Sequence, residues 1–180
     1  MGPVPCFGLC LLGCLLFNPT VEGARNASLA LPRSPCPPGA LRYKNLCYEF
    51  LDDSVGWQEA ELECEYWRKD GHLASILSAT EERRISSYIK RVSSTCCVWL
   101  GLQATRTPIA NPTRLTWEWS DKSPYKSGSI LWDGRAPSTA ISNSECVALI
   151  NVHSPSSTSR WAQYSCNSLF PYICKYRASV

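Results

Sequence analysis

The two histidines of the sequence, His72 and His153, are the first residues to consider for acid–base chemistry. Neither of them lies near a nucleophile motif, because the chain has no Gly-x-Ser-x-Gly, no His-Glu-x-x-His and no phosphate-binding Gly-rich loop. We therefore predict that the protein is not an enzyme. The same scarcity of histidine, with no Cys-x-x-Cys and no His-x-x-x-His spacing, argues against a zinc or redox motif.

Cysteine is the most informative residue type, with eleven copies in 180 residues. Three of them lie in an apolar run at positions 6–17, and the other eight are Cys36, Cys47, Cys64, Cys96, Cys97, Cys146, Cys166 and Cys174. An even number of cysteines in a secreted chain of this size indicates a disulfide framework, although the count alone leaves about 105 pairings open.

The N-terminal region predicts secretion. The apolar run at 6–17 is too short to span a bilayer, which takes ~20 apolar residues, and it fits a signal peptide over residues 1–23 rather than a buried strand or helix. Residues 24–35 are polar and aperiodic, which predicts a flexible mature N-terminus. Asn26 begins an Asn-Ala-Ser glycosylation sequon. No later stretch is apolar enough to cross a membrane, so we expect a released, extracellular product.

The charge excludes one class of partner. The whole chain has a net charge of +3, and removal of Glu22 with the signal peptide leaves 18 − 14 = +4. These basic residues are spread along the chain, so a nucleic-acid partner is not expected. Polyanionic glycans and mineral surfaces remain open.

Two helices and several strands must position whatever site the chain carries. Residues 41–51 predict a strand or hairpin around Lys44 and Asn45. A helix is expected over 56–69, with an apolar stripe of Trp57, Ala60, Cys64 and Trp67. A second helix begins after a Ser-Ala-Thr-Glu cap at 78–81. Its apolar face consists of Ile85, Tyr88, Ile89 and Val92, and we expect both stripes to be core.

The second half of the chain has no helical period. Strands are predicted at 98–102, 115–119, 146–150, 160–164 and 170–174. Between them, residues 120–145 form a long stretch rich in Ser, Pro and Gly, and a loop of that length in a compact domain is usually functional. Two helices followed by mainly antiparallel strands predict an α+β domain.

Taken in order, these segments resemble one known fold family. The resemblance lies in Cys36-Pro37-Pro38-Gly39, Trp57 to Cys64, His72 to Ile76, Trp99-Leu100-Gly101-Leu102, Trp117-x-Trp119-x-Asp121, Cys146, Trp161, Cys166 and Cys174. The pattern resembles the C-type lectin-like domain over residues 36–177. It is closest to the regenerating-islet-derived, lithostathine-like secreted group.

The resemblance implies a fold and a set of disulfides. It implies two helices packed on antiparallel sheets with a long loop region, and the pairs Cys36–Cys47, Cys64–Cys174 and Cys146–Cys166. The second of these pairs would connect the first helix to the last strand.

The resemblance also implies where calcium and sugar would bind, and the matching residues argue against calcium. Sugar-binding members hold calcium with two polar triplets, which fall here on Ala136-Pro137-Ser138 and Trp161-Ala162-Gln163. A proline is present in the first triplet, where the family suggests a cis peptide, but neither triplet carries a carboxylate, and Ca²⁺ needs several oxygen ligands. No cofactor is therefore expected. Asp121, Asp133, Asn143 and Glu145 could form another cation site or could be solvated turn residues.

Trp132 is the best candidate for metal-free stacking on a sugar ring, with Asp133 and Arg135 beside it. The alternative is that Trp132 anchors the long loop in the core, as the family usually does. The candidate ligand-binding residues are Trp132, Asp133, Arg135, Pro137, Ser138 and Gln163.

Cys96 and Cys97 depart from the family's six-cysteine pattern. Adjacent α-carbons lie ~3.8 Å apart, which is less than a disulfide usually spans, so a bond between these neighbours would be strained. The alternatives are free thiols or an inter-chain bond, and we favour an inter-chain bond and a disulfide-linked homodimer.

The sequence thus predicts a secreted lectin-like protein that recognises a glycan, a polysaccharide or another extracellular surface ligand without calcium. Two other functions stay open. One is an eggshell-type matrix protein that acts on mineral, and the other is a venom-type subunit that dimerises to block receptors.

Overall fold

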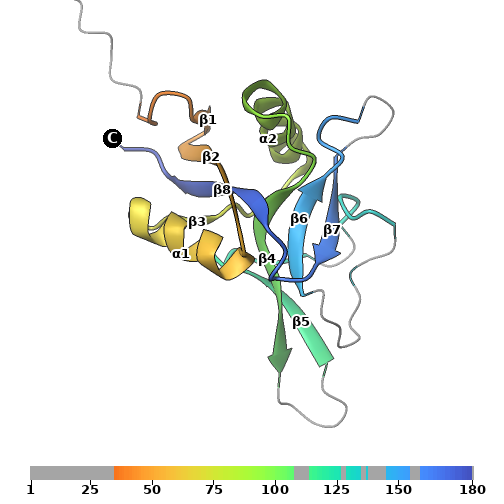
Figure 1. The fold of residues 1–180 in the computed structure, drawn as a ribbon. Coiled ribbons are helices and arrows are strands. Elements are labelled where there is room, and N and C mark those ends of the chain that lie inside the picture. The colour runs from red at the N-terminus through yellow and green to blue at the C-terminus, as the bar shows by residue number, and fades with distance from the viewer. Residues whose placement is uncertain are drawn as a thin grey trace, which may run out of the picture. The chain divides into compact units, whose positions relative to one another are not determined.

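The protein is described here from a computed structural model, which covers residues 35–107, 114–126, 129–134, 137, 145–154 and 159–179. The predicted signal peptide, most of the predicted flexible segment and Asn26 lie outside these residues. The elements in chain order are β1 (Leu41–Tyr43), β2 (Leu46–Val55), α1 (Trp57–Trp67), β3 (His72–Leu73), α2 (Ala79–Val92), β4 (Val98–Thr107), β5 (Arg114–Trp119), β6 (Cys146–Ile150), β7 (Arg160–Tyr164) and β8 (Phe170–Arg177) (Figure 1). The α+β class and every predicted element are confirmed, and β3 was not predicted.

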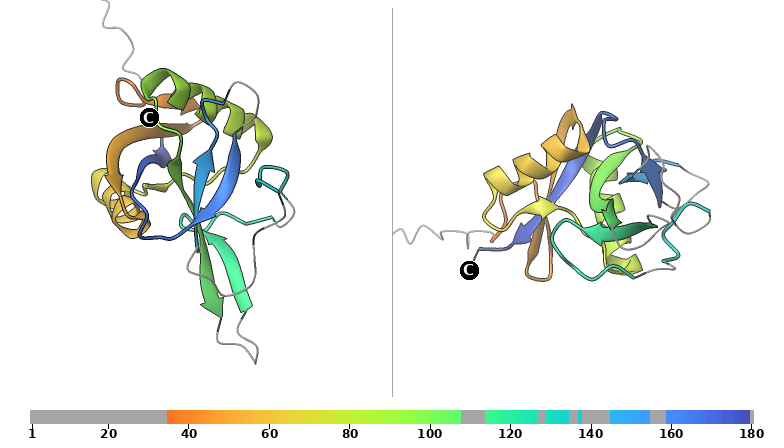
Figure 2. Two further views of the ribbon diagram at one scale, coloured as in Figure 1. Left: turned by 45° about the vertical axis from the view of Figure 1, so that its right-hand side comes forward. Right: turned by 90° about the horizontal axis from the view of Figure 1, so that it is seen from below.

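One sheet connects all the strands, in the order β1-β2-β8-β4-β6-β7, with β3 paired to β8 and β5 paired to β4. The pairings are antiparallel except for β4 and β8, which run parallel where Trp99 faces Tyr172. The β4–β5 hairpin extends beyond the other strands, while α1 and α2 lie at separate places against the sheet (Figure 2). Within the described residues, no helix is long and apolar enough to cross a membrane.

The first hairpin forms where the sequence predicts it. Tyr43 pairs with Leu46, so Lys44 and Asn45 are the two turn residues. Lys44 takes a positive φ of 57°, which a two-residue hairpin turn of right-handed twist commonly requires.

The helices also begin as expected. Ser78 caps α2, because its Oγ accepts a hydrogen bond from the backbone N–H of Glu81 at 3.2 Å. The start of α1 has no side-chain cap at Gly56, and the backbone N–H of Trp57 instead donates to the carbonyl of Cys166 at 2.9 Å. An otherwise unpaired helical donor is thus satisfied by the far end of the chain.

The predicted apolar stripes are wrong at one position in each helix. Trp57, Ala60 and Cys64 are buried, but Trp67 is 61% exposed. Ile85, Tyr88 and Ile89 are buried, but Val92 is 46% exposed. Trp67 and Val92 are the last residues of their helices. The helical period predicts which face is buried, but it does not predict how far along the helix the packing continues.

The three disulfides implied by the family resemblance are confirmed, as Cys36–Cys47, Cys64–Cys174 and Cys146–Cys166. The second joins α1 to β8 across a sequence separation of 110 residues. In the chain-entropy account of cross-links, a loop of that length contributes ~4–5 kcal/mol to the free energy of unfolding. The framework is therefore fixed covalently at the first hairpin, at α1 and between β6 and the turn before β8.

Candidate functional site

Four tryptophans hold the long loop region against the sheet. Trp132, from the loop, contacts Trp117 of β5 and Trp161 of β7 edge to face, with ring centroids 5.6 Å and 5.7 Å apart. Trp161 contacts Trp119 in the same way at 5.4 Å. Such edge-to-face pairs contribute ~0.5–1.5 kcal/mol each beyond their buried area.

Backbone hydrogen bonds complete this attachment. The N–H of Asp133 donates to the carbonyl of Trp161 at 2.9 Å, and the N–H of Trp161 donates to the carbonyl of Leu131 at 2.7 Å. Residues 131–133 thereby form a short parallel bridge with β7, centred on Trp132 and Trp161. These contacts attach residues 131–133 of the loop to β7.

A groove of about 490 Å³ lies beside this cluster, and we call it the loop groove. It is bordered by the segment 76–79, which leads into α2, and by residues of the long loop, and it is lined mainly by Ile76, Leu77, Tyr125, Ile130, Leu131 and Trp161. Lys126 and Ser129 add polar groups to its wall. A groove of this volume, apolar with a few polar groups, is typical of sites for small ligands.

Among the described residues, the fold leaves two buried donors of the groove lining unused, the hydroxyl of Tyr125 and the indole N–H of Trp161. Buried donors of this kind are rare and are usually satisfied by water or a ligand. Lys126 is exposed and supplies a charge at the same place.

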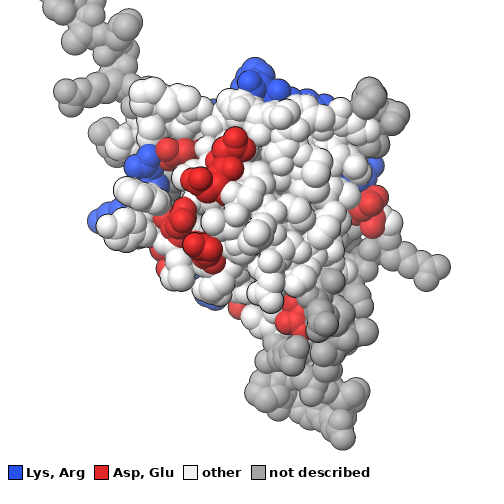
Figure 3. Space-filling view, viewed as in Figure 1, with Lys and Arg blue, Asp and Glu red and all other residues white. Residues whose placement is uncertain are grey.

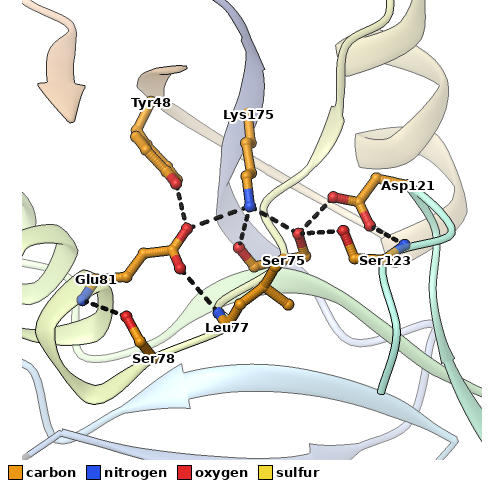
Figure 4. Close-up of polar contacts among 8 residues, drawn as sticks. All are labelled: Tyr48, Ser75, Leu77, Ser78, Glu81, Asp121, Ser123 and Lys175. Atoms are coloured by element: carbon orange, nitrogen blue, oxygen red, sulfur yellow. Dashed lines mark hydrogen bonds and ion pairs between the residues drawn. The ribbon is translucent and has the colours of Figure 1, made fainter. Parts of the chain in front are cut away.

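A buried polar network fixes the two walls of the groove. Lys175 of β8 donates from Nζ to the carbonyl and Oγ of Ser75, both at 2.9 Å, and to Glu81 Oε1 of α2 at 3.2 Å (Figure 4). Glu81 Oε2 in turn accepts a hydrogen bond from the N–H of Leu77 at 2.9 Å. This network sets the position of the segment 76–79.

The network continues into the long loop through Ser75. Its hydroxyl donates to the carboxylate of Asp121, whose other oxygen accepts the N–H of Ser123 at 2.9 Å. On the opposite side, the hydroxyl of Tyr48 donates to Glu81. Burial, followed by this hydrogen bond, raises the pKa of the Tyr48 hydroxyl above its ordinary value. Tyr48 therefore remains a neutral donor at any physiological pH.

The predicted ligand-binding residues differ in how far they are exposed, and two of them lie outside the described part of the chain. Trp132 is only 5% exposed and occupies the anchor position, whereas Asp133 beside it is exposed. Pro137 and Gln163 are partly buried, with Gln163 on β7 opposite Val147. Arg135 and Ser138 lie outside the described residues. The loop groove itself was not predicted, because its wall at 76–79 comes from a segment that the sequence marks only as the start of a helix.

The calcium site that the family resemblance implies does not fit the residues present. On β7, Ala162 pairs with Ala148 and offers no side-chain oxygen, and Gln163 has an amide in place of a carboxylate. Of the auxiliary cation candidates, Asp121 is committed to Ser75 and Ser123, and Asn143 lies outside the described residues. On β7, the described residues therefore lack the carboxylate that this calcium site would need, while an auxiliary cation site that includes Asp133 and Glu145 stays an open expectation.

Cys96 and Cys97 are both free thiols in this single chain, with their Sγ atoms 2.9 Å apart. Cys96 is exposed and Cys97 is buried, so only Cys96 can reach another molecule without a rearrangement. Burial, followed by the neighbouring Cys96 thiol, raises the pKa of Cys97 to about 12. An inter-chain bond stays a prediction, and the exposure of Cys96 favours it over Cys97 for such a bond.

A second face of the domain is acidic. Figure 3 shows Asp and Glu side chains gathered over α1 and β2, where Asp52, Asp53 and Glu59 are exposed. Tyr66 and Trp67 lie on the same helix, 81% and 61% exposed, with their rings edge to face at 5.1 Å. Sequence periodicity placed Trp67 in the core, so this exposed aromatic pair was missed.

Comparison with known proteins shows one consistent similarity. The Lectin C-type domain family model matches residues 53–176. The chain is 33% identical over 169 residues to regenerating islet-derived protein 3-alpha of Mus musculus, over 93% of this chain and 92% of that one. It is 32% identical over 170 residues to lithostathine of Rattus norvegicus, over 93% and 95% of the two chains. The solved structure of human lithostathine superposes with a TM-score of 0.61 at 30% identity, covering 79% of this chain and 99% of that chain.

Proposed function

Because the chain belongs to the C-type lectin domain family, which comprises binding domains rather than enzymes, we propose that it is a secreted binding protein that recognises a glycan or polysaccharide surface without calcium. The observation that carries the proposal is the composition of β7. Where the calcium-binding members of the family carry an Asn-Asp pair, the strand presents Ala162 and Gln163.

The mode of loop attachment supports the same proposal. In a calcium-dependent site the ion holds the loop and the ligand together, so removal of the ion affects both. Here the aromatic contacts of Trp132 and the two backbone hydrogen bonds of Trp161 hold the loop. The binding surface can therefore keep its form without a cation.

The loop groove and its rim are the proposed contact surface. Apolar side chains such as Ile130, which is 81% exposed, suit the C–H face of a sugar ring, while Lys126 suits an acidic substituent. Asp133 and Gln163 are proposed as hydrogen-bonding partners at the edge of the loop, and we extend the proposal to Arg135, Pro137 and Ser138. Trp132 contributes by positioning these residues.

Binding to mannan, peptidoglycan and heparin, each measured with calcium and with a chelator, tests the proposal. We expect binding to at least one polysaccharide with equal affinity in both conditions. If mannose or galactose bound only in the presence of calcium, the conclusion that β7 lacks a calcium-dependent sugar site would be wrong.

Matched variants locate the surface. Replacing Lys126 and Ile130 together by alanine is expected to weaken binding about tenfold, the effect of losing ~1.4 kcal/mol of contact energy. The control is Trp67→Ala, which removes an exposed aromatic side chain from α1. If Trp67→Ala abolishes binding and the groove variant does not, the ligand binds on α1 and the proposed surface is wrong.

A second function, a mineral-binding matrix role, is favoured by one observation. The acidic face over α1 and β2 offers several carboxylates toward a calcium mineral (Figure 3). Calcite is therefore included among the ligands tested. Binding to calcite alone, lost on replacing Asp52 and Asp53 by asparagine, would replace the lectin-like proposal.

Secretion and dimerisation complete the proposal. The apolar run at 6–17 supports export of the chain, and the exposed thiol of Cys96 supports a disulfide between two copies. Non-reducing electrophoresis of the secreted protein tests the latter. A dimer band that Cys96→Ser removes and Cys97→Ser leaves is expected, and a purely monomeric band excludes the dimer.

A further inference from the structure

Three metal-ligating side chains converge on the face of α1 that meets β3, away from the long loop. Glu61 and Glu65 lie one turn apart on α1, and His72 begins β3. The Nδ1 atom of His72 lies 2.6 Å from Glu61 Oε1 and 3.6 Å from Glu65 Oε1. One ligand atom from each residue falls within 4.8 Å of the other two. The described residues hold no other such group of three.

The turn between α1 and β3 fixes this arrangement. The N–H of Gly71 donates to the carbonyl of Arg68 at 2.8 Å, and Asp70 takes a positive φ of 55°. A side chain at Gly71 would place its Cβ 2.5 Å from the carbonyl oxygen of Cys64, so only glycine allows the chain to return so closely onto the helix. His72 is thereby brought back beside Glu61, which precedes it by 11 residues.

Glu61 is oriented before any ion arrives. Its side chain is 7% exposed, and its Oε2 accepts a hydrogen bond from the backbone N–H of Leu73 at 2.8 Å. Leu73 itself pairs with Cys174 of β8, beside the Cys64–Cys174 disulfide. A ligating carboxylate that is held by an outer hydrogen bond in this way binds metal more tightly than a mobile one.

The other two side chains leave the cluster open to solvent. His72 is 30% exposed and Glu65 is 49% exposed, so an ion and its remaining water ligands can enter from outside. Glu61 and Glu65 are also like charges spaced i, i+4 on one helix, an arrangement that is unfavourable unless a cation lies between them.

We propose that Glu61, Glu65 and His72 form a binding site for a zinc-class transition-metal ion, with water in the fourth position. An imidazole together with carboxylates suits Zn²⁺, whereas Ca²⁺ and Mg²⁺ prefer oxygen alone. Bonds of ~2.0–2.2 Å in a tetrahedral site separate ligand atoms by roughly 3.4 Å. The 3.6 Å spacing of Glu65 and His72 matches this value, and the closer Glu61–His72 pair opens by less than about 1 Å as the ion displaces the hydrogen bond between them.

The bound ion would connect α1 to β3 next to the longest disulfide-closed loop of the chain. Neither the loop groove nor β7 contributes a ligand, so this site is separate from the proposed carbohydrate surface. Loss of one function would therefore leave the other measurable.

Titration of the secreted, disulfide-intact protein with ZnCl₂ tests the proposal by calorimetry and by thermal unfolding. We expect one ion per chain and a rise in Tm of about 5–10 °C at a zinc concentration about a hundred times the Kd. His72→Asn and Glu65→Gln are each expected to lower the association constant at least about tenfold. Glu59→Gln, on the same helix but outside the cluster, is the matched control and should bind as the wild type does.

The free thiols of Cys96 and Cys97 could also bind zinc, so a variant without them is needed as a control. Cys96→Ser with Cys97→Ser should retain zinc binding in full. Zinc binding that survives His72→Asn, or that the double cysteine variant abolishes, would overturn the proposal, as would the absence of any binding to the wild type. Tm measured without zinc confirms that each variant is folded, and Glu65→Gln, at an exposed position, keeps the test decisive if His72→Asn is unstable.

Discussion

The ammonium group of Lys175 lies 3.2 Å from the carboxylate of Glu81, and the two side chains are 8% and 7% exposed. With its two further bonds to Ser75, this ammonium uses all three of its donors. The pair joins the last strand of the domain to its second helix, across 94 residues of sequence.

Replacing Lys175 by methionine tests the contribution of this pair. The substitution leaves the buried Glu81 carboxylate without its cation, and we expect the free energy of unfolding to fall by about 3–5 kcal/mol in chemical denaturation. Adding Glu81→Gln should recover part of that loss, because the unpaired charge is then gone. Lys122→Met, at an exposed pair with Glu118, should change stability by less than about 1 kcal/mol. A small effect of Lys175→Met would mean that Tyr48 and Leu77 alone stabilise Glu81.

Replacing Trp132 by alanine tests the anchoring of the long loop. The ring is 5% exposed and contacts two other tryptophans, so its removal leaves a cavity and should cost ~3–5 kcal/mol of unfolding free energy. Trp67→Ala is the control, because an exposed tryptophan should change stability by less than about 0.5 kcal/mol. If Trp132→Ala keeps full stability but loses ligand binding, the ring acts as a contact residue and not as an anchor.

The thiol pair predicts unequal chemistry at neighbouring residues. Burial raises the pKa of Cys97 from 9.0 to about 12, so Cys97 remains a thiol at neutral pH in the folded chain. Alkylation at pH 8, followed by peptide mass spectrometry, should modify Cys97 at least about a hundredfold more slowly in the folded than in the denatured chain. Cys96, which is exposed, is the internal control.

The same pKa shift makes stability depend on alkaline pH. A group whose pKa is raised on folding holds its proton more tightly in the folded state, so its contribution is complete below pH 9 and is lost as the pH rises toward 12. Unfolding midpoints should fall over this range, and Cys97→Ala should reduce the slope. An unchanged slope would assign the alkaline transition to the buried tyrosines.

Much of the fold could be predicted because its elements depend on local pattern. The hairpin turn at Lys44 and the cap at Ser78 depend on residues within four positions of each other. The errors at Trp67 and Val92 have the opposite origin, since the end of a packing surface depends on which distant strands reach that far. The single parallel contact between Trp99 and Tyr172 is likewise a property of the assembled sheet.

The sites were harder to predict, because they are formed by segments that lie far apart in the sequence. The replacement of the family's Asn-Asp pair by Ala162 and Gln163 could be predicted directly, because it needs only the identity of the residues that match the family's motif. The loop groove combines the segment 76–79 with residues 124–131 and Trp161, and no local spacing reveals that combination. The contact between Glu61 and His72 depends on the close approach of the backbone at Gly71 to α1. No local sequence pattern predicts that approach.

The bridge between Trp132 and Trp161 separates two properties that a shared ion would tie together. When one cation both shapes a loop and holds its ligand, a substitution that alters specificity also endangers the shape. Here the aromatic contacts of Trp132 attach the loop to the sheet. Residues at the rim of the loop groove can therefore be exchanged while this attachment stays intact. If the proposed contact surface is correct, residues such as Lys126 and Asp133 can thus be exchanged to alter recognition without rebuilding the domain.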